Sequence, residues 1–123
     1  MKDTLVHLME RSLLEVFSER DSFRRRNAID NVYADDCTFF EEDEEIVGRE
    51  ALNAKVDSIL QKLPAHFVFR PIGPVELNHD VGRLGWHLGP ASGPPVATGM
   101  DFAWFKNGRI QLLYVFLDKA IGK

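Results

Sequence analysis

Two strand-like segments joined by Asn107-Gly108 place the strongest constraint on how this chain can fold. Residues 96–105 and 109–118 are rich in β-branched, aromatic and aliphatic side chains, which is typical of strands. Asn-Gly favours the type I′ turn, whose twist matches that of two antiparallel strands. The two segments are therefore predicted to form a β-hairpin, and the rest of the chain must build a sheet around it.

Further strands are predicted upstream of this hairpin. Residues 66–70 form one, and residues 74–78 form the next or its start. A turn at His79-Asp80 precedes an extended segment over residues 82–88, and the Gly- and Pro-rich residues 89–95 form a loop.

The first half of the chain has helical periodicity. Apolar residues recur at spacings of three and four over residues 5–17, and further helices are predicted over residues 22–33 and 49–63, the last ending at Pro64. Between them, residues 37–41 read as a strand and the acidic run 41–45 as a hairpin or loop. Helices at the start and an antiparallel sheet at the end indicate an α+β fold, built as a single domain over residues 1–123.

Composition excludes several classes of function. The 123 residues carry a net charge of −4 and one cysteine, Cys37, which is expected to be a small core residue in a reducing, cytoplasmic setting. The basic cluster at residues 24–26 is expected to be a solvated helix face, so nucleic acid is not an expected partner. No apolar run is long enough for a membrane span. The histidines lie in separate elements, so no metal site is expected.

Asp101 is the most informative residue, because it lies in the middle of a predicted apolar strand. A carboxylate there is costly to bury unless it is paired or protonated. Alternation places it on one face with the small residues Ala97, Gly99 and Ala103, which would leave space above it. Either Asp101 binds a ligand in that space, or it satisfies a buried donor such as a tyrosine hydroxyl or an imidazole. By the same alternation, Glu41 at the end of its strand shares a face with Cys37 and Phe39.

Large apolar side chains are predicted on the other face of the final hairpin. A monomer rarely exposes such a patch, so a homodimer through this outer sheet face is expected. Its members are Phe102, Trp104, Ile110, Leu112, Tyr114 and Phe116.

Two stretches of the sequence resemble the SnoaL-like branch of the nuclear-transport-factor-2-like (NTF2-like) superfamily, which includes ketosteroid isomerases and polyketide cyclases. One is Tyr33-Ala34-Asp35-Asp36 followed by Gly48-Arg49-Glu50, and the other is Gly99-Met100-Asp101 followed by the Asn107-Gly108 hairpin. The resemblance implies a cone-shaped α+β barrel of the cystatin-like kind, in which a strongly curved antiparallel sheet is closed by three helices around an apolar pocket.

The resemblance also implies a set of site residues. The general base of the ketosteroid isomerases corresponds to Glu41 and the neutral acid of their oxyanion hole to Asp101. The tyrosine of that hole corresponds to Phe17, so this donor is missing, and steroid isomerisation itself is not expected. The resemblance also places Tyr33 and Trp86 in the wall of the expected pocket, and the alternation of the last strand adds Leu113, Val115 and Leu117.

Two functions follow from these residues, and the sequence leaves both open. In the first, the chain is an enzyme without a cofactor, an isomerase, cyclase or lyase that moves a proton next to a carbonyl, with Glu41 ionised and Asp101 protonated. In the second, it is a non-catalytic module for ligand binding or dimerisation. In either case the expected ligand is small and apolar or aromatic, with one carbonyl or phenol oxygen.

Overall fold

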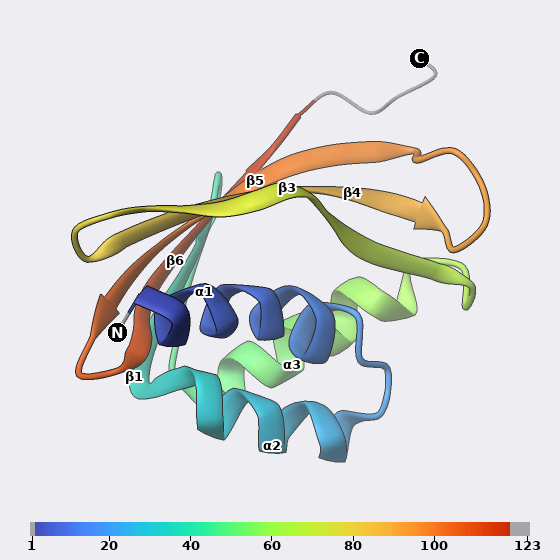
Figure 1. Ribbon diagram of the computed structural model, residues 1–123. Coiled ribbons are helices and arrows are strands. Elements are labelled where there is room, and N and C mark those ends of the chain that lie inside the picture. Colours follow the sequence, from blue (N-terminus) through green and yellow to red (C-terminus); the bar gives the residue numbers. More distant parts are fainter. Residues whose placement is uncertain (1, 119–123) are drawn as a thin grey trace.

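The computed structural model describes residues 2–118, which form a curved sheet with all the helices on one of its faces (Figure 1). Helix α1 (Lys2–Arg11) continues directly into a π-helical turn, η1 (Ser12–Phe17). Helix α2 (Ser22–Val32) begins at Asp21, whose side chain accepts hydrogen bonds from the backbone N–H groups of Phe23 and Arg24. Helix α3 (Arg49–Gln61) completes the helical layer. The three predicted helices are confirmed, whereas the π-helical turn was not predicted.

The sheet contains six strands in the order β2-β1-β6-β5-β4-β3. Their bounds are β1 (Tyr33–Glu41), β2 (Glu44–Val47), β3 (Phe67–Asn78), β4 (Val81–Pro90), β5 (Ala97–Lys106) and β6 (Arg109–Leu117). Strand β1 pairs with β6 in parallel, at Phe39 and Leu113 for example, and all other pairs are antiparallel. The expected α+β fold with a curved sheet is confirmed. The sheet is mixed rather than wholly antiparallel, and it does not close, because β2 and β3 remain its two edges.

Strand β3 joins the two segments that were predicted as separate strands, residues 66–70 and 74–78. It is continuous over Phe67–Asn78, with a shift in its pairing to β4 between Ile72 and Glu76. Gly73 lies in this irregular part with a φ of 69°, a conformation that glycine adopts at little cost. The two expected strand segments therefore belong to one bent strand, and the turn at His79-Asp80 leads into β4.

The predicted hairpin between β5 and β6 is confirmed, since Asn107 and Gly108 have φ angles of 53° and 73°. Just beyond the turn, the pairing shifts between Trp104 and Phe105, so that Phe105 lies opposite Ile110 and Trp104 opposite Leu112. This irregularity turns Ile110 inward, where it is fully buried. The prediction that Ile110 belongs to the outer face is therefore wrong, because simple alternation does not count the extra residue of a bulge.

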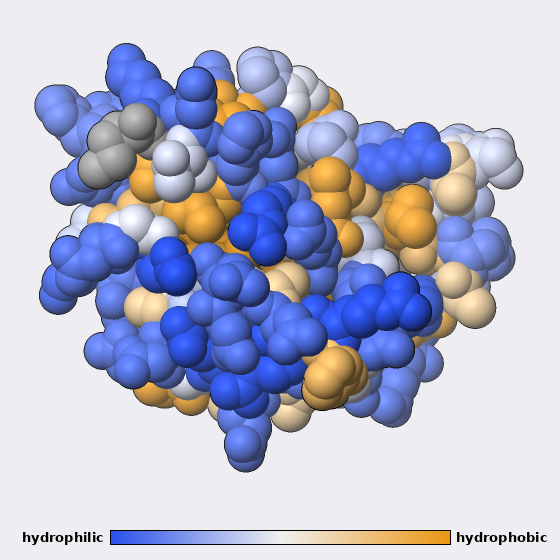
Figure 2. Space-filling view, turned by 60° about the horizontal axis from the view of Figure 1, so that its bottom comes forward, coloured by the Kyte–Doolittle hydropathy of each residue, from blue (hydrophilic) through white to orange (hydrophobic). Residues whose placement is uncertain are grey.

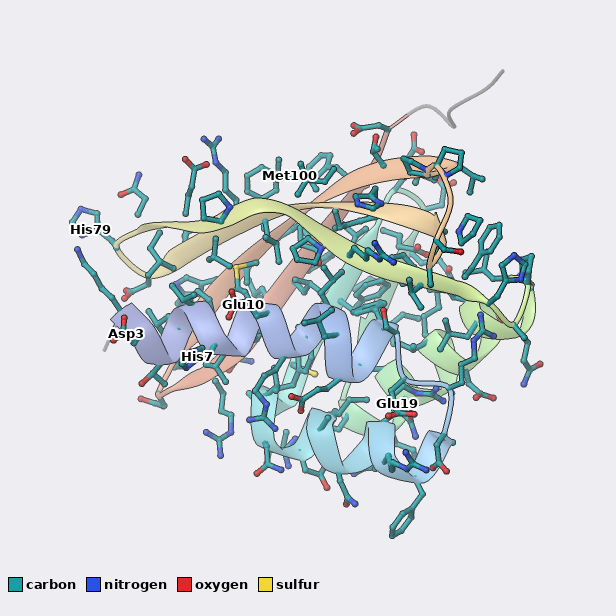
Figure 3. All side chains as sticks on the ribbon, turned by 45° about the vertical axis from the view of Figure 1, so that its right-hand side comes forward. Asp3, His7, Glu10, Glu19, His79 and Met100 are labelled. Atoms are coloured by element: carbon teal, nitrogen blue, oxygen red, sulfur yellow. The ribbon has the colours of Figure 1, made fainter. Side chains whose placement is uncertain are left out.

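The other predicted members of the outer face lie on one side of the β5–β6 pair. Cross-strand partners bring Phe102 next to Tyr114 and Trp104 next to Leu112. Met100 is opposite Phe116 and points away from the helices (Figure 3). The exposed fraction of Phe116 is 58%. On the side opposite the helices, the sheet thus presents an apolar surface to solvent.

Arg25 contradicts the prediction of a solvated basic cluster on α2. Its side chain is completely buried between α2 and α3. The guanidinium donates to Asn53 at 2.6 Å, to Asp57 at 2.8 Å and to the backbone oxygen of Glu19 at 2.6 Å. These acceptors compensate the cost of burying the charge, which local sequence alone did not reveal because two of them come from the next helix.

The core lies between the helices and the inner face of the sheet. Turned so that the helical side comes forward, the surface in Figure 2 is largely hydrophilic, with hydrophobic side chains in separate patches. No helix among residues 2–118 is long and apolar enough to cross a membrane.

Candidate ligand-binding cavity

A cavity of about 170 Å³ lies between η1, the end of α3 and the inner face of the sheet. Its walls are almost entirely apolar. The buried end is formed by strands β4 and β5 and by η1, whereas the mouth is formed by partly exposed side chains of β1, α3 and β6. The lining residues are Leu13, Phe17, Phe39, Glu41, Ile59, Leu63, Phe69, Trp86, Leu88, Asp101, Val115 and Leu117.

Asp101 and Trp86 form the polar end of this cavity. Both are 4% exposed, and the indole Nε1–H of Trp86 donates to Oδ1 of Asp101 at 2.8 Å. The pairing of β4 with β5 explains why they meet: Leu84 is opposite Asp101, so Trp86, two residues further along β4, points to the same face and reaches back over it.

Burial raises the pKa of Asp101 from its ordinary value of 3.8 to about 7, while the hydrogen bond from Trp86 lowers it. No salt bridge reaches this carboxyl from any residue between 2 and 118. Asp101 therefore carries a substantial neutral fraction near pH 7. A neutral carboxyl can accept the indole N–H at one oxygen and donate its proton from the other.

The second oxygen of Asp101 is open to the cavity. Oδ2 makes no hydrogen bond with the described residues. Among these residues, every side-chain nitrogen or oxygen that is shielded from solvent does have a hydrogen-bond partner. Oδ2 is therefore accessible, and it is accessible from the cavity that Asp101 lines. The sequence left open whether Asp101 binds a ligand or satisfies a buried donor. It does satisfy a donor, an indole rather than a phenol or an imidazole, but only with one of its two oxygens.

Gly99 lies opposite Trp86 and under its ring. A Cβ atom at this position would overlap the six-membered ring of the indole and the backbone oxygen of Phe116. The space that the small residues of β5 were expected to leave above Asp101 is therefore partly filled by Trp86. The remaining space opens toward the helices, where the cavity is found.

Glu41 lies at the mouth of the cavity, paired with Lys55 of α3. The ammonium nitrogen of Lys55 is 2.9 Å from Oε1 of Glu41, and it also bonds to Glu44. The hydrogen bond to Glu44, and after it the one to Glu41, raises the pKa of Lys55. The hydrogen bond from Lys55 in turn lowers the pKa of Glu44. Lys55 thus ties the end of β1, the start of β2 and the middle of α3 together at the mouth.

Tyr33 and Leu113 were expected in the walls but are not among the lining residues. The hydroxyl of Tyr33 is hydrogen-bonded to Ser12 of η1, and the Tyr33 side chain is buried beside the cavity. Burial raises the pKa of the phenol well above its usual range, and the nearby charge of Asp101 adds to this effect. Leu113 is fully buried in the core. Tyr33 and Leu113 therefore pack in the core and do not face the ligand space.

The predicted Phe17, Trp86, Val115 and Leu117 do line the cavity, together with Glu41 and Asp101. Sequence reasoning missed the six other apolar lining residues, and it missed Lys55. Phe39 could have been found, because it shares the alternation that placed Glu41 inside. The π-helical turn brings Leu13 and Phe17 into the wall while Leu14 remains exposed. Such turns are rare, and no local sequence rule predicts them.

Metal ligands and the cysteine were the other candidates for reactive groups among residues 2–118. No cluster of three or more His, Cys, Asp or Glu residues able to hold a metal ion occurs within residues 2–118. Cys37 is buried in β1, and burial raises the pKa of its thiol to about 11, so the reactive thiolate is scarce at neutral pH.

By sequence alone, the chain matches no protein-family model and no curated protein. Solved structures do match it. A candidate isomerase of the SnoaL-like family from Agrobacterium tumefaciens is 24% identical with a TM-score of 0.85, over 95% of this chain and 99% of that one. The chain has the fold of the SnoaL-like and NTF2-like proteins. Further matches to this fold are a candidate SnoaL-like polyketide cyclase from a Jannaschia species, with a TM-score of 0.78, 12% identity and coverage of 94% and 86%, and a candidate ketosteroid isomerase from Kribbella flavida, with a TM-score of 0.72, 13% identity and coverage of 98% and 82%.

The SnoaL-like fold expected from the two sequence motifs is thereby confirmed. At these identities the agreement concerns the fold. A designed protein with a curved β-sheet also matches, with a TM-score of 0.72 and 13% identity over 96% of this chain and 88% of that one. This architecture by itself therefore does not assign a reaction.

Proposed function

We propose that the cavity binds a small apolar ligand through one carbonyl or phenol oxygen and that the protein catalyses proton transfer next to that carbonyl, as an isomerase, cyclase or lyase. One observation carries this proposal: a buried carboxyl, Asp101, has one oxygen held by Trp86 and the other facing an apolar cavity. The similarity in fold to candidate isomerases and cyclases supports the same class of reaction.

The proposed step needs only the two carboxyl groups. The Glu41 carboxylate takes a proton from the carbon next to the carbonyl, and the electron pair of that C–H bond forms the C=C bond of an enolate. The negative charge moves to the substrate oxygen, where the neutral Asp101 donates a hydrogen bond. Return of the proton from Glu41 to another carbon completes an isomerisation and leaves both carboxyls unchanged. This proton transfer involves no cofactor.

A second candidate is a ligand-binding module without catalysis. The ion pair between Glu41 and Lys55 favours it, because a general base must be free to reach the substrate proton. Phe17, at the position expected for a second hydrogen-bond donor, supplies only an apolar ring to the cavity. In this reading Asp101 still binds the ligand oxygen, but Glu41 remains paired with Lys55 at the mouth.

The test replaces Asp101 by Asn and, separately, by Ala. Asn keeps an acceptor for Trp86 and a donor for the ligand, so ligand binding should be retained, whereas Ala should weaken it. Infrared difference spectra of the wild type against Asp101→Asn should show the carbonyl band of a neutral acid near pH 7. A carboxylate band with no neutral acid at that pH would contradict the proposal. Exchange of α-deuterium from a bound ketone, lost in Glu41→Gln, would separate the enzyme from the module.

We also propose that two copies of the chain associate through the outer face of β5 and β6. The single cysteine suits a location in the cytoplasm, where it stays reduced. Support comes from the side chains of this face, which are apolar and lie together in register. Phe102 forms an edge-on aromatic pair with Phe116 at 5.5 Å, and Phe40 stacks on Tyr114 at 4.5 Å. A second copy offers the same apolar side chains, which suits a two-fold interface.

A further inference from the structure

The size of the cavity limits what can fill it. Its volume of about 170 Å³ is close to that of an engineered protein cavity of roughly 150 Å³ that stays dry and binds benzene. The walls that set this volume are large and firmly packed. Phe69 contacts Trp86 edge-on at 5.2 Å and Phe17 at 6.2 Å, and Phe17 contacts Phe39 at 5.8 Å. One six-membered ring fits this space with its oxygen at Asp101, whereas a second fused ring would extend toward the mouth, against the side chains of Ile59 and Leu63.

The buried end offers the ligand a single polar contact. Trp86 has one N–H, and Asp101 already accepts it. What remains is Oδ2 of Asp101, in a wall that is otherwise apolar. A ligand with two polar groups would leave one of them buried without a hydrogen bond, at a cost of about 1–3 kcal/mol. One oxygen on one ring therefore satisfies this end of the cavity.

The mouth carries negative charge. Residues 41–45 are all acidic, and Glu41 borders the cavity directly. Lys55 offsets part of this charge through its contacts with Glu41 and Glu44, and the more distant Lys62 acts on Glu44. The exposed Glu42 and Asp43, which follow Glu41 in the turn, add further negative charge beside the mouth, and they form no salt bridge within the described part of the chain. An anionic ligand would be repelled on approach and would lose its hydration inside.

From these three observations we propose that the site selects a neutral ligand of one ring with a single oxygen, bound with that oxygen at Asp101, and rejects both carboxylate analogues and fused-ring ketones. This inference rests on the proposed function for the location of the site, and adds the class of ligand. The negative charge of the mouth and the firm aromatic walls do the selecting, while Asp101 sets the orientation.

The test measures binding to the Trp104→Phe variant, in which Trp86 is the only tryptophan, by Trp86 fluorescence and ligand-observed NMR. The probes are acetophenone and phenol as neutral single rings with one oxygen, benzoate as the charged single ring, and 2-acetonaphthone and a steroid ketone as larger ketones. Acetophenone and phenol should bind at least tenfold more tightly than benzoate and than either larger ketone. Equal binding of benzoate would overturn selection by charge, and equal binding of a fused-ring ketone would overturn selection by size. Saturable binding of none of the probes would instead contradict the proposed function itself.

Two variants locate the cause of each preference. The double variant Glu42→Gln, Asp43→Asn removes charge outside the cavity, and it should strengthen benzoate binding severalfold while acetophenone binding stays the same. Ile59→Ala removes bulk from the α3 side of the wall and should shift the preference toward 2-acetonaphthone. If the double variant changes the binding of benzoate and acetophenone alike, or if Ile59→Ala leaves the preference for the smaller ketone unchanged, the proposed cause is wrong.

Discussion

The indole ring of Trp86 lies directly over Gly99 on the neighbouring strand, in the space that any side chain at position 99 would occupy. This contact holds the indole in the position from which its Nε1–H reaches Asp101. Gly99 thus acts on the site through Trp86, without itself contacting the ligand space.

Gly99→Ala should therefore displace Trp86 and break its hydrogen bond to Asp101. Overpacking of this kind typically lowers the free energy of unfolding by about 1–3 kcal/mol, and ligand binding at Asp101 should weaken as well. Denaturant unfolding and Trp86 fluorescence would measure the two effects. Gly85→Ala is a matched control on β4, since a Cβ there would make ordinary contacts with Ile72 and Met100 at 3.6–3.7 Å. An equal effect of the two substitutions would contradict the special role of Gly99.

The raised pKa of Asp101 predicts how stability changes with pH. Between the ordinary value of 3.8 and about 7, the unfolded chain has lost this proton whereas the folded protein keeps it. Stability from this group is therefore fully present below about pH 4, and it should fall by about 1.4 kcal/mol per pH unit up to about pH 7, then level off. The free energy of unfolding of the wild type minus that of Asp101→Asn isolates the effect, because the other titrating groups are shared. A difference that stays constant or rises across this range would mean that Asp101 is ionised when folded.

Arg25 should contribute strongly to stability, because its side chain is completely buried and hydrogen-bonded. Arg25→Ala leaves the acceptors on Asn53 and Glu19 without their donor and opens a cavity between α2 and α3. Buried polar groups left without a partner cost about 1–3 kcal/mol, whereas Asp57, whose side chain is 40% exposed, can be solvated instead. Its neighbour Arg24, whose side chain is 74% exposed, provides the control, and Arg24→Ala should change the free energy of unfolding by less than about 0.5 kcal/mol. Similar losses for both substitutions would contradict the assignment of Arg25 as the helix-joining residue.

Trp104→Glu should convert the proposed dimer to a monomer, because it places a charge in the apolar face of β5 and β6. Sedimentation velocity at micromolar concentration would show the change. Phe23→Glu is the control: Phe23 is 77% exposed on α2, on the helical side, and its replacement should leave the mass unchanged. A wild-type protein that sediments as a monomer would rule out the dimer.

Local patterns predicted the elements of this protein well and its long-range contacts less well. Asn107-Gly108 specifies its turn through backbone conformation alone, and the helix predicted to stop at Pro64 ends at Gln61. Asp101 was placed inside correctly, since the alternation of β5 is regular up to Trp104. Ile110 was misplaced because a bulge interrupts that alternation.

The partners of charged residues could not be predicted, since they come from distant segments. Arg25 is buried because α3 supplies Asn53 and Asp57, and Glu41 is held because α3 supplies Lys55. A sequence pattern records the charge of each residue but not the residue that faces it after folding. Trp86 was expected in the wall, but its bond to Asp101 depends on the register between two strands.

The parallel pairing of β1 with β6 affects how the protein reaches its folded state. Gln111 of β6 bonds to Asp36 of β1 across 75 positions of the sequence, and β1 has only the short β2 on its other side. Closing so large a loop costs entropy before any contact is gained, and topologies rich in distant contacts fold slowly. Strand β1 carries Phe39 and Glu41, so the ligand space is complete only when this pairing has formed. A ligand that binds in the cavity therefore stabilises the folded protein over any state in which β1 is unpaired.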